Sequence, residues 1–368
     1  MTMKKKILCV VGTRPEAIKM APVILALQQE SWADVRVLAT AQHRHMLDQV
    51  NQFFGITPDI DLDIMRPNQA LTELTARLLM KLDEVLETER PDVVLVQGDT
   101  TTVMSVALAC FYRRIPIGHV EAGLRTWDMQ NPFPEEANRV ITGKLARWHF
   151  APTEGSRQNL LKDGVQDADI VVTGNTVIDA LLMSASKDLE IGIELDPGKR
   201  LVLVTSHRRE NFGEPFRNIC RALRTLAENN PEVQFLYPVH PNPNVKDIAY
   251  EFLDKLPNVV LCAPLDYAPF IAAMKRATII LTDSGGVQEE APALGKPVLV
   301  LRSETERPEA VEQGVVKLVG ANYDLIVSEA QRLLDDEAAY RAMARGISPY
   351  GDGKAAQRIA EILRRDCA

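Results

Sequence analysis

The segment 277–301 constrains the fold more than any other part of the sequence. We predict that it forms a strand, a turn, a helix and a second strand. In order they are the apolar strand 277–281, the turn Ser284-Gly285-Gly286, the helix 287–294 closed by Gly295, and the apolar strand 297–301. A strand that continues through a helix into another strand is the repeating unit of parallel α/β sheets. We therefore expect a parallel sheet whose faces are covered by helices.

The turn at Ser284, Gly285 and Gly286 suits a bound phosphate. Glycines let a ligand approach the backbone, and a helix N-terminus offers free N–H groups and a partial positive charge. Glu289 and Glu290 follow in the first turns of the predicted helix. Glu290 is a candidate acceptor for sugar hydroxyl groups, and the alternative is that both carboxylates only complement the helix dipole.

The same alternation of apolar strands and helices continues through all 368 residues. The predicted strands are 7–11, 35–39, 93–96, 115–120, 148–151 and 170–172 in the first half, and 201–205, 233–238, 259–262, 277–281, 297–301 and 315–319 in the second. At roughly 150 residues per domain, this length predicts two domains. We predict an α/β protein with two Rossmann-like, doubly wound parallel-sheet domains, 1–174 and 175–353, that face each other across a ligand-binding cleft. The amphipathic helix 354–365 could pack on either domain.

Composition excludes several classes of protein. With 46% hydrophobic residues the chain can bury a large core, and a net charge of -8 without a long basic run argues against nucleic-acid binding. No window approaches about 18 uninterrupted apolar residues. The first strand starts directly after Lys6, without a signal peptide, so we expect a cytoplasmic protein with no membrane partner. The five cysteines are scattered without a C-x-x-C pair, which indicates reduced, buried thiols.

Charged residues follow two strands of the first half. Gly12 allows the turn after the first strand, and the sequence there is neither G-x-G-x-x-G nor a Walker A loop, which argues against a dinucleotide cofactor and an NTPase. Arg14 is a candidate anion-binding residue, and Lys19 is either a second one or a solvated surface charge. Asp99 ends another strand, either as a catalytic carboxylate or as the cap of the next helix.

Three glutamates add to this set of candidates. Glu121 leaves an apolar strand and needs a partner, for which Arg125 is the candidate; a structural buried salt bridge is the alternative reading. Glu135 opens a helix behind two prolines. Glu136 beside it is expected to face solvent.

The histidines of the sequence suggest different roles. His207 ends a strand together with two arginines, which suits an acid, a base or a phosphate contact. His43 and His45 have metal-like spacing, but no neighbouring ligand set completes a site, so no metal is expected. His240 lies at a strand end, and its spacing alone assigns no role.

Seven passages together resemble one known family. They are G-T-R-P-E-A-I-K-M-A-P, G-D-T-T-T, H-V-E-A-G-L-R-T, P-F-P-E-E-A-N-R, H-R-R-E-N-F-G, D-S-G-G-V-Q-E-E-A-P-A-L-G-K-P-V-L and T-E-R-P-E-A. In this order, between Val11 and Gly353, they resemble the non-hydrolysing UDP-N-acetylglucosamine 2-epimerases of bacteria. One departure is Ser206, where the family pattern has glycine before His207.

The resemblance implies a fold similar to the two-domain GT-B glycosyltransferases, with the UDP-sugar in the cleft between the domains. It also implies a homodimer, a C-terminal helix (354–368) that returns to the first domain, and a product used in cell-envelope polysaccharides. It implies no cofactor.

The resemblance also implies roles for individual residues. The UDP part would contact Arg14, His207, Ser284, Gly285, Gly286, Glu290 and Arg307, with Phe270 near the uracil. The catalytic carboxylates would be Asp99, Glu121 and Glu135. UDP-N-acetylglucosamine would also activate the enzyme at a second, neighbouring site, for which the candidates are Gln42, His43, Gln69, Glu136, Arg209 and His240.

The implied chemistry explains this inventory. The C2 proton of the sugar is not next to a carbonyl, so its direct removal would leave an unstabilised carbanion. Elimination of UDP to a glycal, followed by re-addition, avoids this and needs no redox cofactor. It requires groups that stabilise a departing diphosphate and acid/base groups at C2. The alternatives are a hydrolysing epimerase, a GT-B glycosyltransferase, and a UDP-sugar-binding regulator without turnover.

Overall fold

The structure is a computed structural model that describes residues 4–40, 44–64, 66, 69–305 and 307–367. The chain divides into two compact units, the first formed by Met1–Leu182 and Tyr350–Ala368 and the second by Met183–Pro349. The limits predicted from the sequence were 174 and 353. The shift arises because helix α7 (Thr176–Ala185) starts within the first unit, where Asp179 accepts a hydrogen bond from the Ala356 N–H (2.8 Å).

The first unit contains a seven-stranded parallel sheet in the order β3-β2-β1-β4-β5-β6-β7. The strands are β1 (Lys5–Val11), β2 (Ala33–Ala39), β3 (Ile60–Asp61), β4 (Val93–Gln97), β5 (Ile117–Val120), β6 (Trp148–Ala151) and β7 (Ile170–Val172). All residues of β4 are buried, and residues 93–96 form an apolar run, as expected of a parallel strand that is covered on both faces. The strand order reverses between β1 and β4, and loops at such a switch point form ligand sites in open α/β sheets.

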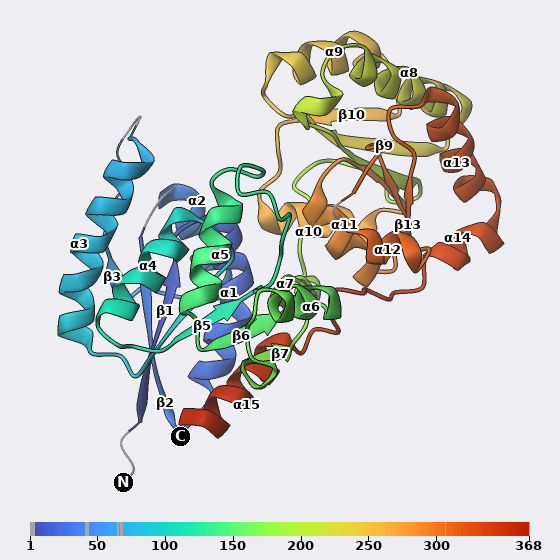
Figure 1. The fold of residues 1–368 in the computed structure, drawn as a ribbon. Helices are drawn as coiled ribbons and strands as arrows, with labels where there is room; N and C mark the ends of the chain where they lie inside the picture. Colours follow the sequence, from blue (N-terminus) through green and yellow to red (C-terminus); the bar gives the residue numbers. More distant parts are fainter. Residues whose placement is uncertain (1–3, 41–43, 65, 67–68, 306, 368) are drawn as a thin grey trace. The chain divides into compact units, whose positions relative to one another are not determined.

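Helices cover both faces of this sheet (Figure 1). Neighbouring helices α3 (Leu71–Glu89), α4 (Thr101–Tyr112) and α5 (Glu135–Leu145) form one layer, and α1 (Arg14–Gln28), α2 (Arg44–Phe54) and α15 (Ala355–Cys367) form another. The remaining elements are α6 (Glu154–Lys162), η1 (Asp167–Asp169) and α7. Leu74, Leu78, Leu82 and Leu86 repeat every fourth residue and bury one stripe of α3.

The C-terminal helix belongs to the first unit, where α15 packs against α1 (Figure 1). Ile359 and Leu363 are fully buried on its inner face. Near the C-terminal end of α15, Asp366 accepts a hydrogen bond from Trp148 Nε1 (2.8 Å). Amphipathic spacing alone left both domains open as partners, because it identifies an apolar face but not the surface that covers it.

The second unit contains a six-stranded parallel sheet in the order β10-β9-β8-β11-β12-β13. The strands are β8 (Arg200–Thr205), β9 (Val233–Pro238), β10 (Val259–Cys262), β11 (Ile279–Thr282), β12 (Val298–Val300) and β13 (Val316–Leu318). Its switch point lies between β8 and β11, which pair from Ile279 opposite Val202 to Thr282 opposite Thr205. The predicted pair of Rossmann-like, doubly wound sheets is therefore confirmed.

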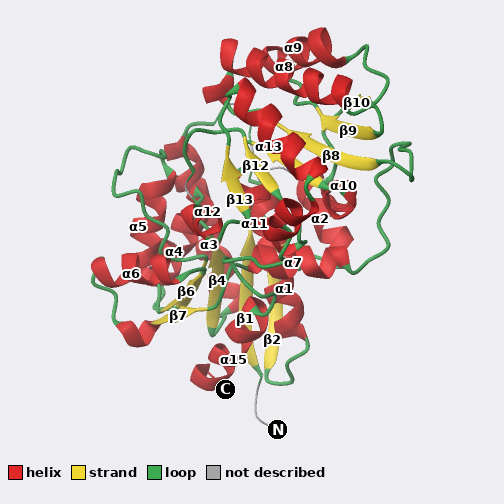
Figure 2. Ribbon diagram, turned by 90° about the vertical axis from the view of Figure 1, so that its right-hand side faces the viewer, coloured by secondary structure: helices red, strands yellow, loops and turns green. Residues whose placement is uncertain are grey.

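Helices also cover this second sheet, whose strands are yellow in Figure 2. Packed along one face are α8 (Glu214–Asn229), α9 (Pro243–Leu253) and α13 (Tyr323–Asp335), with α14 (Glu337–Met343) beside α13. The other elements are η2 (Arg209–Asn211), α10 (Tyr267–Arg276), α11 (Gly285–Ala293) and α12 (Pro308–Glu312). In the described part of the chain, no helix combines the length and apolarity needed to cross a membrane.

Burial differs among the five cysteines, all of which are free. Cys9, Cys110 and Cys220 are fully enclosed, whereas Cys262 and Cys367 are half-buried. Burial raises the pKa of each enclosed thiol to about 12. These three thiols therefore stay protonated and serve as small apolar core groups.

Candidate active site

The loop after β1 is organised by a buried carboxylate. Glu16 is 3% exposed, and its Oε2 accepts hydrogen bonds from the backbone N–H groups of Gly12 (2.6 Å) and Thr13 (2.8 Å). Thr13 in turn caps α1, which completes a capping box with Glu16. A Cβ atom at Gly12 would lie 2.7 Å from Thr40 Oγ1 and 2.9 Å from Glu16, so a glycine between β1 and α1 leaves room for these side chains.

Glu121 lies directly after β5 and is held from three sides. Lys19 Nζ is 2.7 Å from both carboxylate oxygens, Asn175 Nδ2 donates at 3.1 Å, and Gln97 Nε2 donates a further hydrogen bond. The Glu121 backbone has a positive φ of 64°, which is uncommon for a residue with a side chain. The side chain is only 8% exposed. Strand β4, helix α1 and the start of α7 thus fix this carboxylate in one position.

The predicted partner of Glu121 was wrong. Arg125 donates from Nε to Asp163 (2.6 Å), and its side chain is 1% exposed. Lys19 takes the place beside Glu121, so Lys19 is not a solvated surface charge. Lys19 lies on α1, more than one hundred residues earlier in the chain, and no local spacing signals such a pair.

Asp99 follows β4 and pairs with a cation from α5. Its Oδ2 is 2.6 Å from Arg139 Nη2, and Asn138 Nδ2 donates to its backbone carbonyl (2.9 Å). The cap of α4 is Thr100, which accepts from Val103 N (3.3 Å), so Asp99 does not cap that helix. The Asp99 side chain keeps 29% exposure beside its arginine.

Glu136 is buried and holds the loop before α5, contrary to the prediction that it faces solvent. It is 1% exposed and accepts from the backbone N–H groups of Thr126 (3.1 Å) and Trp127 (3.0 Å). Arg139 Nη1 lies 3.0 Å from its other oxygen, so one guanidinium links Glu136 to Asp99. The half-buried Glu135 is the first residue of α5.

His119 supports the turn that presents Asp99. Its buried Nε2 lies 2.7 Å from the carbonyl oxygen of Gly98, a residue with φ of 83°. Burial lowers the pKa of His119 to about 4, so the ring is neutral at physiological pH. Because a carbonyl only accepts, Nε2 carries the proton.

In the second unit, the loop after β8 places His207 at the surface of the switch point. The side chain is 42% exposed, and its ring stacks on His240, with centroids 5.7 Å apart. Asp283, fully buried after β11, lies 3.5 Å from His207 Nδ1. Burial lowers the pKa of His207, Asp283 acts in the opposite direction, and the charges of Arg208 and His240 lower it further.

The N-terminus of α11 lies beside this loop. Ser284 is the cap residue, and Gly285 and Gly286 form the first helical turn rather than a separate turn before the helix. A Cβ atom at Gly285 would lie 2.8 Å from the guanidinium of Arg307, so that cation lies against the helix start. Arg307 also donates from Nε to Glu289 (2.6 Å). An N-terminus with an adjacent arginine suits an anion.

Comparison with known proteins identifies the family. A family model described as UDP-N-acetylglucosamine 2-epimerase matches residues 25–364. The chain belongs to this family. It is 57% identical to the UDP-N-acetylglucosamine 2-epimerase of Yersinia pestis, covering 98% of each chain, and 55% identical to that of Escherichia coli K12, covering 98% of this chain and 99% of the other. A crystal structure of the Neisseria meningitidis UDP-GlcNAc 2-epimerase bound to UDP-GlcNAc has a TM-score of 0.87 and 49% identity, covering 98% of this chain and 100% of the other.

The predicted site residues of this epimerase-family chain fall into two groups. The first unit brings together Lys19, Asp99 and Glu121 with the loop that leads to Arg14. The second unit places His207, Arg209, His240, Phe270, Ser284, Gly285, Gly286, Glu290 and Arg307 on loops and helices around β8 and β11. Phe270 is half-buried in α10, Glu290 is buried in α11, and Arg209 and His240 are exposed.

Two candidates of the predicted second site, Gln42 and His43, lie outside the described residues. Gln69 accepts a hydrogen bond from Arg77 Nη2 (2.8 Å). Among the described residues, no group of three or more His, Cys, Asp or Glu side chains is arranged to hold a metal ion.

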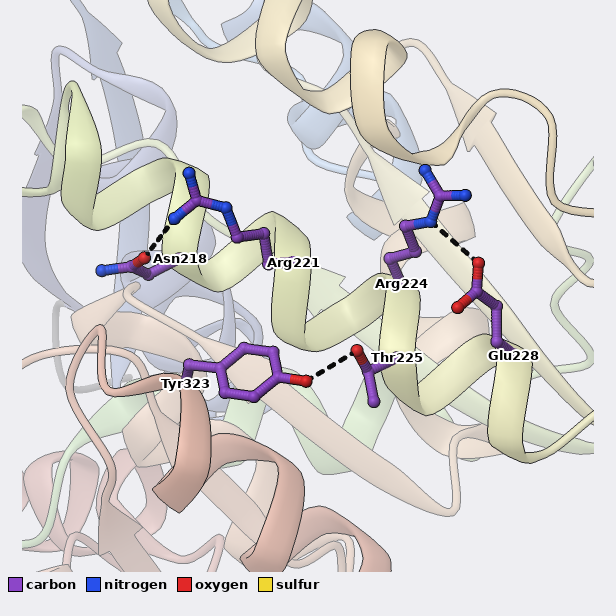
Figure 3. A pocket seen from close by; sticks show the side chains of 6 residues that line it. All are labelled: Asn218, Arg221, Arg224, Thr225, Glu228 and Tyr323. Atoms are coloured by element: carbon purple, nitrogen blue, oxygen red, sulfur yellow. Dashed lines mark hydrogen bonds and ion pairs between the residues drawn. The ribbon is translucent and has the colours of Figure 1, made fainter.

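A shallow hollow on the second unit does not carry the predicted chemistry. It is lined by Asn218, Arg221, Arg224, Thr225, Glu228 and Tyr323, from α8 and α13 (Figure 3). Its arginines already have partners: Arg221 contacts Asn218 (2.7 Å), and Arg224 contacts Glu228 (2.8 Å). Arg221 also pairs with Glu214 (2.8 Å), so each of the two arginines already has a carboxylate partner.

Sequence reasoning missed the residues that hold the site together. Gln97, Arg139, Asn175 and Asp283 all contact a predicted site residue. Two of them had a signal, since Arg139 is three residues after Glu136 on the same predicted helix and Asp283 follows an apolar strand. Gln97 and Asn175 had none, because amides of this kind are common at loop ends.

Proposed function

We propose that this protein interconverts UDP-N-acetylglucosamine and UDP-N-acetylmannosamine by reversible elimination and re-addition of UDP, without hydrolysis. Family membership supports the substrate, and the Neisseria relative was crystallised with UDP-GlcNAc. The arrangement of charges supports the reaction: carboxylates in the first unit and anion-binding groups in the second.

In the first step, a base removes the C2 proton while the C1–O bond breaks. The electron pair of the C–H bond forms the C1–C2 double bond, and UDP leaves with the electrons of the C1–O bond, which gives 2-acetamidoglucal. In the second step, a UDP oxygen attacks C1 and an acid delivers a proton to the opposite face of C2. Asp99, Glu121 and Glu135 are the proposed acid/base groups.

The departing diphosphate needs positive charge, which the second unit supplies in our proposal. The α11 N-terminus at Ser284 and Gly285, with Arg307 against it and His207 nearby, matches the charge that develops on UDP. Arg14 at the start of α1 is a further proposed contact of the diphosphate. Glu290 would accept from hydroxyl groups, and Phe270 would lie against the uracil.

The observation that carries the proposal is the setting of Glu121. Glu121 is held by Lys19 and two amides, and unlike Glu136, which holds a loop, it has a backbone with positive φ. Such fixed positions and backbone strain are typical of catalytic groups. If one carboxylate oxygen of Glu121 took up the C2 proton, the other oxygen would keep its contact with Lys19.

Proton NMR of the protein with UDP-N-acetylglucosamine in D2O tests the proposal. Deuterium at C2 together with a UDP-linked N-acetylmannosamine signal is expected. Free N-acetylmannosamine with UDP would assign the hydrolysing reaction instead. Binding without any C2 exchange would contradict both and favour a transferase or a regulator.

We also propose that the substrate activates the enzyme at a second site and that the chain forms a homodimer. Arg209 and His240 are both exposed, and the ring of His240 stacks on His207, so both are proposed to contact the activating UDP-sugar. Glu136 would act by holding the loop at Thr126, since its oxygens already accept three hydrogen bonds. We expect the reaction rate to rise sigmoidally with substrate concentration in the wild type and to lose this sigmoidal shape in Arg209→Ala. Light scattering of the wild type tests the proposed homodimer.

A further inference from the structure

Asp283 is a fully buried carboxylate to which the proposed reaction assigns no role. It lies between the end of β11 and the loop after β8. Its Oδ2 accepts four hydrogen bonds from that loop: Ser206 Oγ (2.9 Å), His207 N (2.8 Å), Arg208 N (2.9 Å) and Asn211 Nδ2 (3.2 Å). One oxygen therefore fixes the backbone of the loop that carries His207.

The other oxygen faces the imidazole. Oδ1 has no hydrogen-bond donor among the described residues and lies 3.5 Å from Nδ1 of His207. Burying an ionised carboxylate is unfavourable unless each oxygen meets a donor or a positive charge. The Nδ1–H group of His207 is the donor in position to satisfy Oδ1.

Asp283 also joins the two proposed anion-binding elements. It directly precedes Ser284, the cap residue of α11. The strands that lead to the two elements are neighbours, and the hydroxyl groups of Thr205 and Thr282 lie 2.6 Å apart. A single carboxylate thus sets the position of the His207 loop relative to the helix N-terminus.

We infer that Asp283 is a positioning residue that holds His207 with its Nδ1–H toward Oδ1, presents Nε2 to the diphosphate, and stabilises the imidazolium ion when the anion is bound. The inference deepens the proposed function and rests on it for the identity of the anion. The orientation and titration of His207 can be measured without any substrate.

The charges around His207 define the expected titration. Burial, Arg208 and His240 lower the pKa of His207, and Asp283 raises it. Replacing Asp283 by a neutral residue removes the raising contribution, so the imidazolium ion should persist only to a lower pH than in the wild type. UDP affinity should then begin to fall at a lower pH as well.

Asp283→Asn should also exchange the tautomer of the neutral ring. The four donors around Oδ2 require an acceptor, so the amide oxygen takes that place and the NH2 group takes the place of Oδ1. An NH2 group facing Nδ1 can only donate. Nδ1 must then accept, and the proton moves to Nε2, as happens when the aspartate of a catalytic triad is replaced by asparagine.

Nitrogen-15 NMR of the histidine side chains in the ligand-free full chain provides the test, with His207→Asn used to assign the signal. We expect the Nδ1–H tautomer in the wild type, and the Nε2–H tautomer with a lower titration midpoint in Asp283→Asn. Ser206→Ala is the matched control, because it removes one hydrogen bond to the same Oδ2 and keeps the charge, and it should retain the wild-type tautomer.

An Nε2–H tautomer in the wild type would overturn the inference, and this measurement needs no folded variant at position 283. An unchanged titration midpoint in folded Asp283→Asn would overturn it too. Failure of the wild type to turn over UDP-N-acetylglucosamine would contradict the proposed function instead, and the two failures are measured on different samples.

Discussion

The loop after β5 in the first unit and the loop after β8 in the second both end a buried parallel strand in charged residues, but their charges are arranged in opposite ways. At the first loop the proposed reactive group is a carboxylate, Glu121, which is paired with Lys19 and nearly buried. At the second, the carboxylate Asp283 is buried behind the loop, and His207 is exposed in front of it.

In our proposal, this difference lets one architecture provide two kinds of chemistry. The loop after β8 lies at the switch point of its sheet, and the loop after β5 lies one strand away from the switch point between β1 and β4. A proton-transfer group needs a fixed position, which internal partners provide. An anion-binding group needs unsatisfied donors, which an exposed imidazole and a helix N-terminus provide.

Glu121→Gln should separate the two sites most clearly. We expect turnover to fall by roughly a thousandfold, because the amide cannot transfer the C2 proton, while UDP affinity stays within about twofold. C2 deuterium exchange and calorimetric titration with UDP measure the two quantities. Glu84→Gln, at an exposed glutamate on α3, is the control and should change neither. A parallel loss of UDP affinity would show that Glu121 itself contributes to binding UDP.

Arg125→Met tests whether a charge pair of the first unit serves stability alone. Removing one partner of a pair with a 1% exposed arginine should lower the free energy of unfolding by about 3 kcal/mol, because Asp163 loses its compensating charge. Urea denaturation measures this loss, and the folded variant should bind UDP normally. Arg157→Met, which breaks an exposed pair with Asp167, should lower it by less than about 1 kcal/mol.

Arg307→Ala is the corresponding test in the second unit. The loss of a charged donor beside the α11 N-terminus should weaken UDP binding by about tenfold to a hundredfold. Part of the loss should come from Glu289, left without this cation, so Arg307→Ala combined with Glu289→Gln should recover some affinity. Arg341→Ala on the exposed face of α14 is the control. Wild-type affinity in Arg307→Ala would remove this arginine from the proposed anion site.

Glu16→Gln should have the smallest effect of these variants. We expect it to change how the free energy of unfolding depends on pH. Burial raises the pKa of Glu16 above its unfolded value, so its contribution to stability is present at low pH and decreases as the pH rises through the folded pKa. The wild type should therefore lose stability relative to the variant as the pH rises above the unfolded value of 4.5. Urea midpoints over this rise in pH measure the difference, and a constant difference would contradict the assignment.

Much of the fold was predictable because local patterns carry it. Apolar runs such as 148–151, 170–172, 233–238 and 259–262 coincide with β6, β7, β9 and β10. The short strand β3 (Ile60–Asp61) was not predicted, since two residues carry no periodic signal. Gly295 ends α11 with φ of 68°, as its position after the helix predicted.

The candidate site was predictable only in part. Residues at strand ends, such as Asp99 and Glu121, were identified because the carboxyl ends of parallel strands form the ligand-binding edge of a sheet. Their partners were not, and Arg125 was assigned wrongly to Glu121. Which charged groups form an ion pair depends on their distance in the folded chain, and Arg125 lies beside Asp163, the residue after α6.

By itself the sequence determined two doubly wound sheets, the positions of the strand ends, the family, and the types of charged group that those ends carry. These follow from periodicity, turn residues and motifs, which act over a few neighbouring residues. Only the tertiary structure decided that Lys19 pairs with Glu121, that Arg139 pairs with Asp99, and that Asp283 lies beside the ring of His207. Such contacts join residues far apart in the chain, and close packing of the folded sheets selects them.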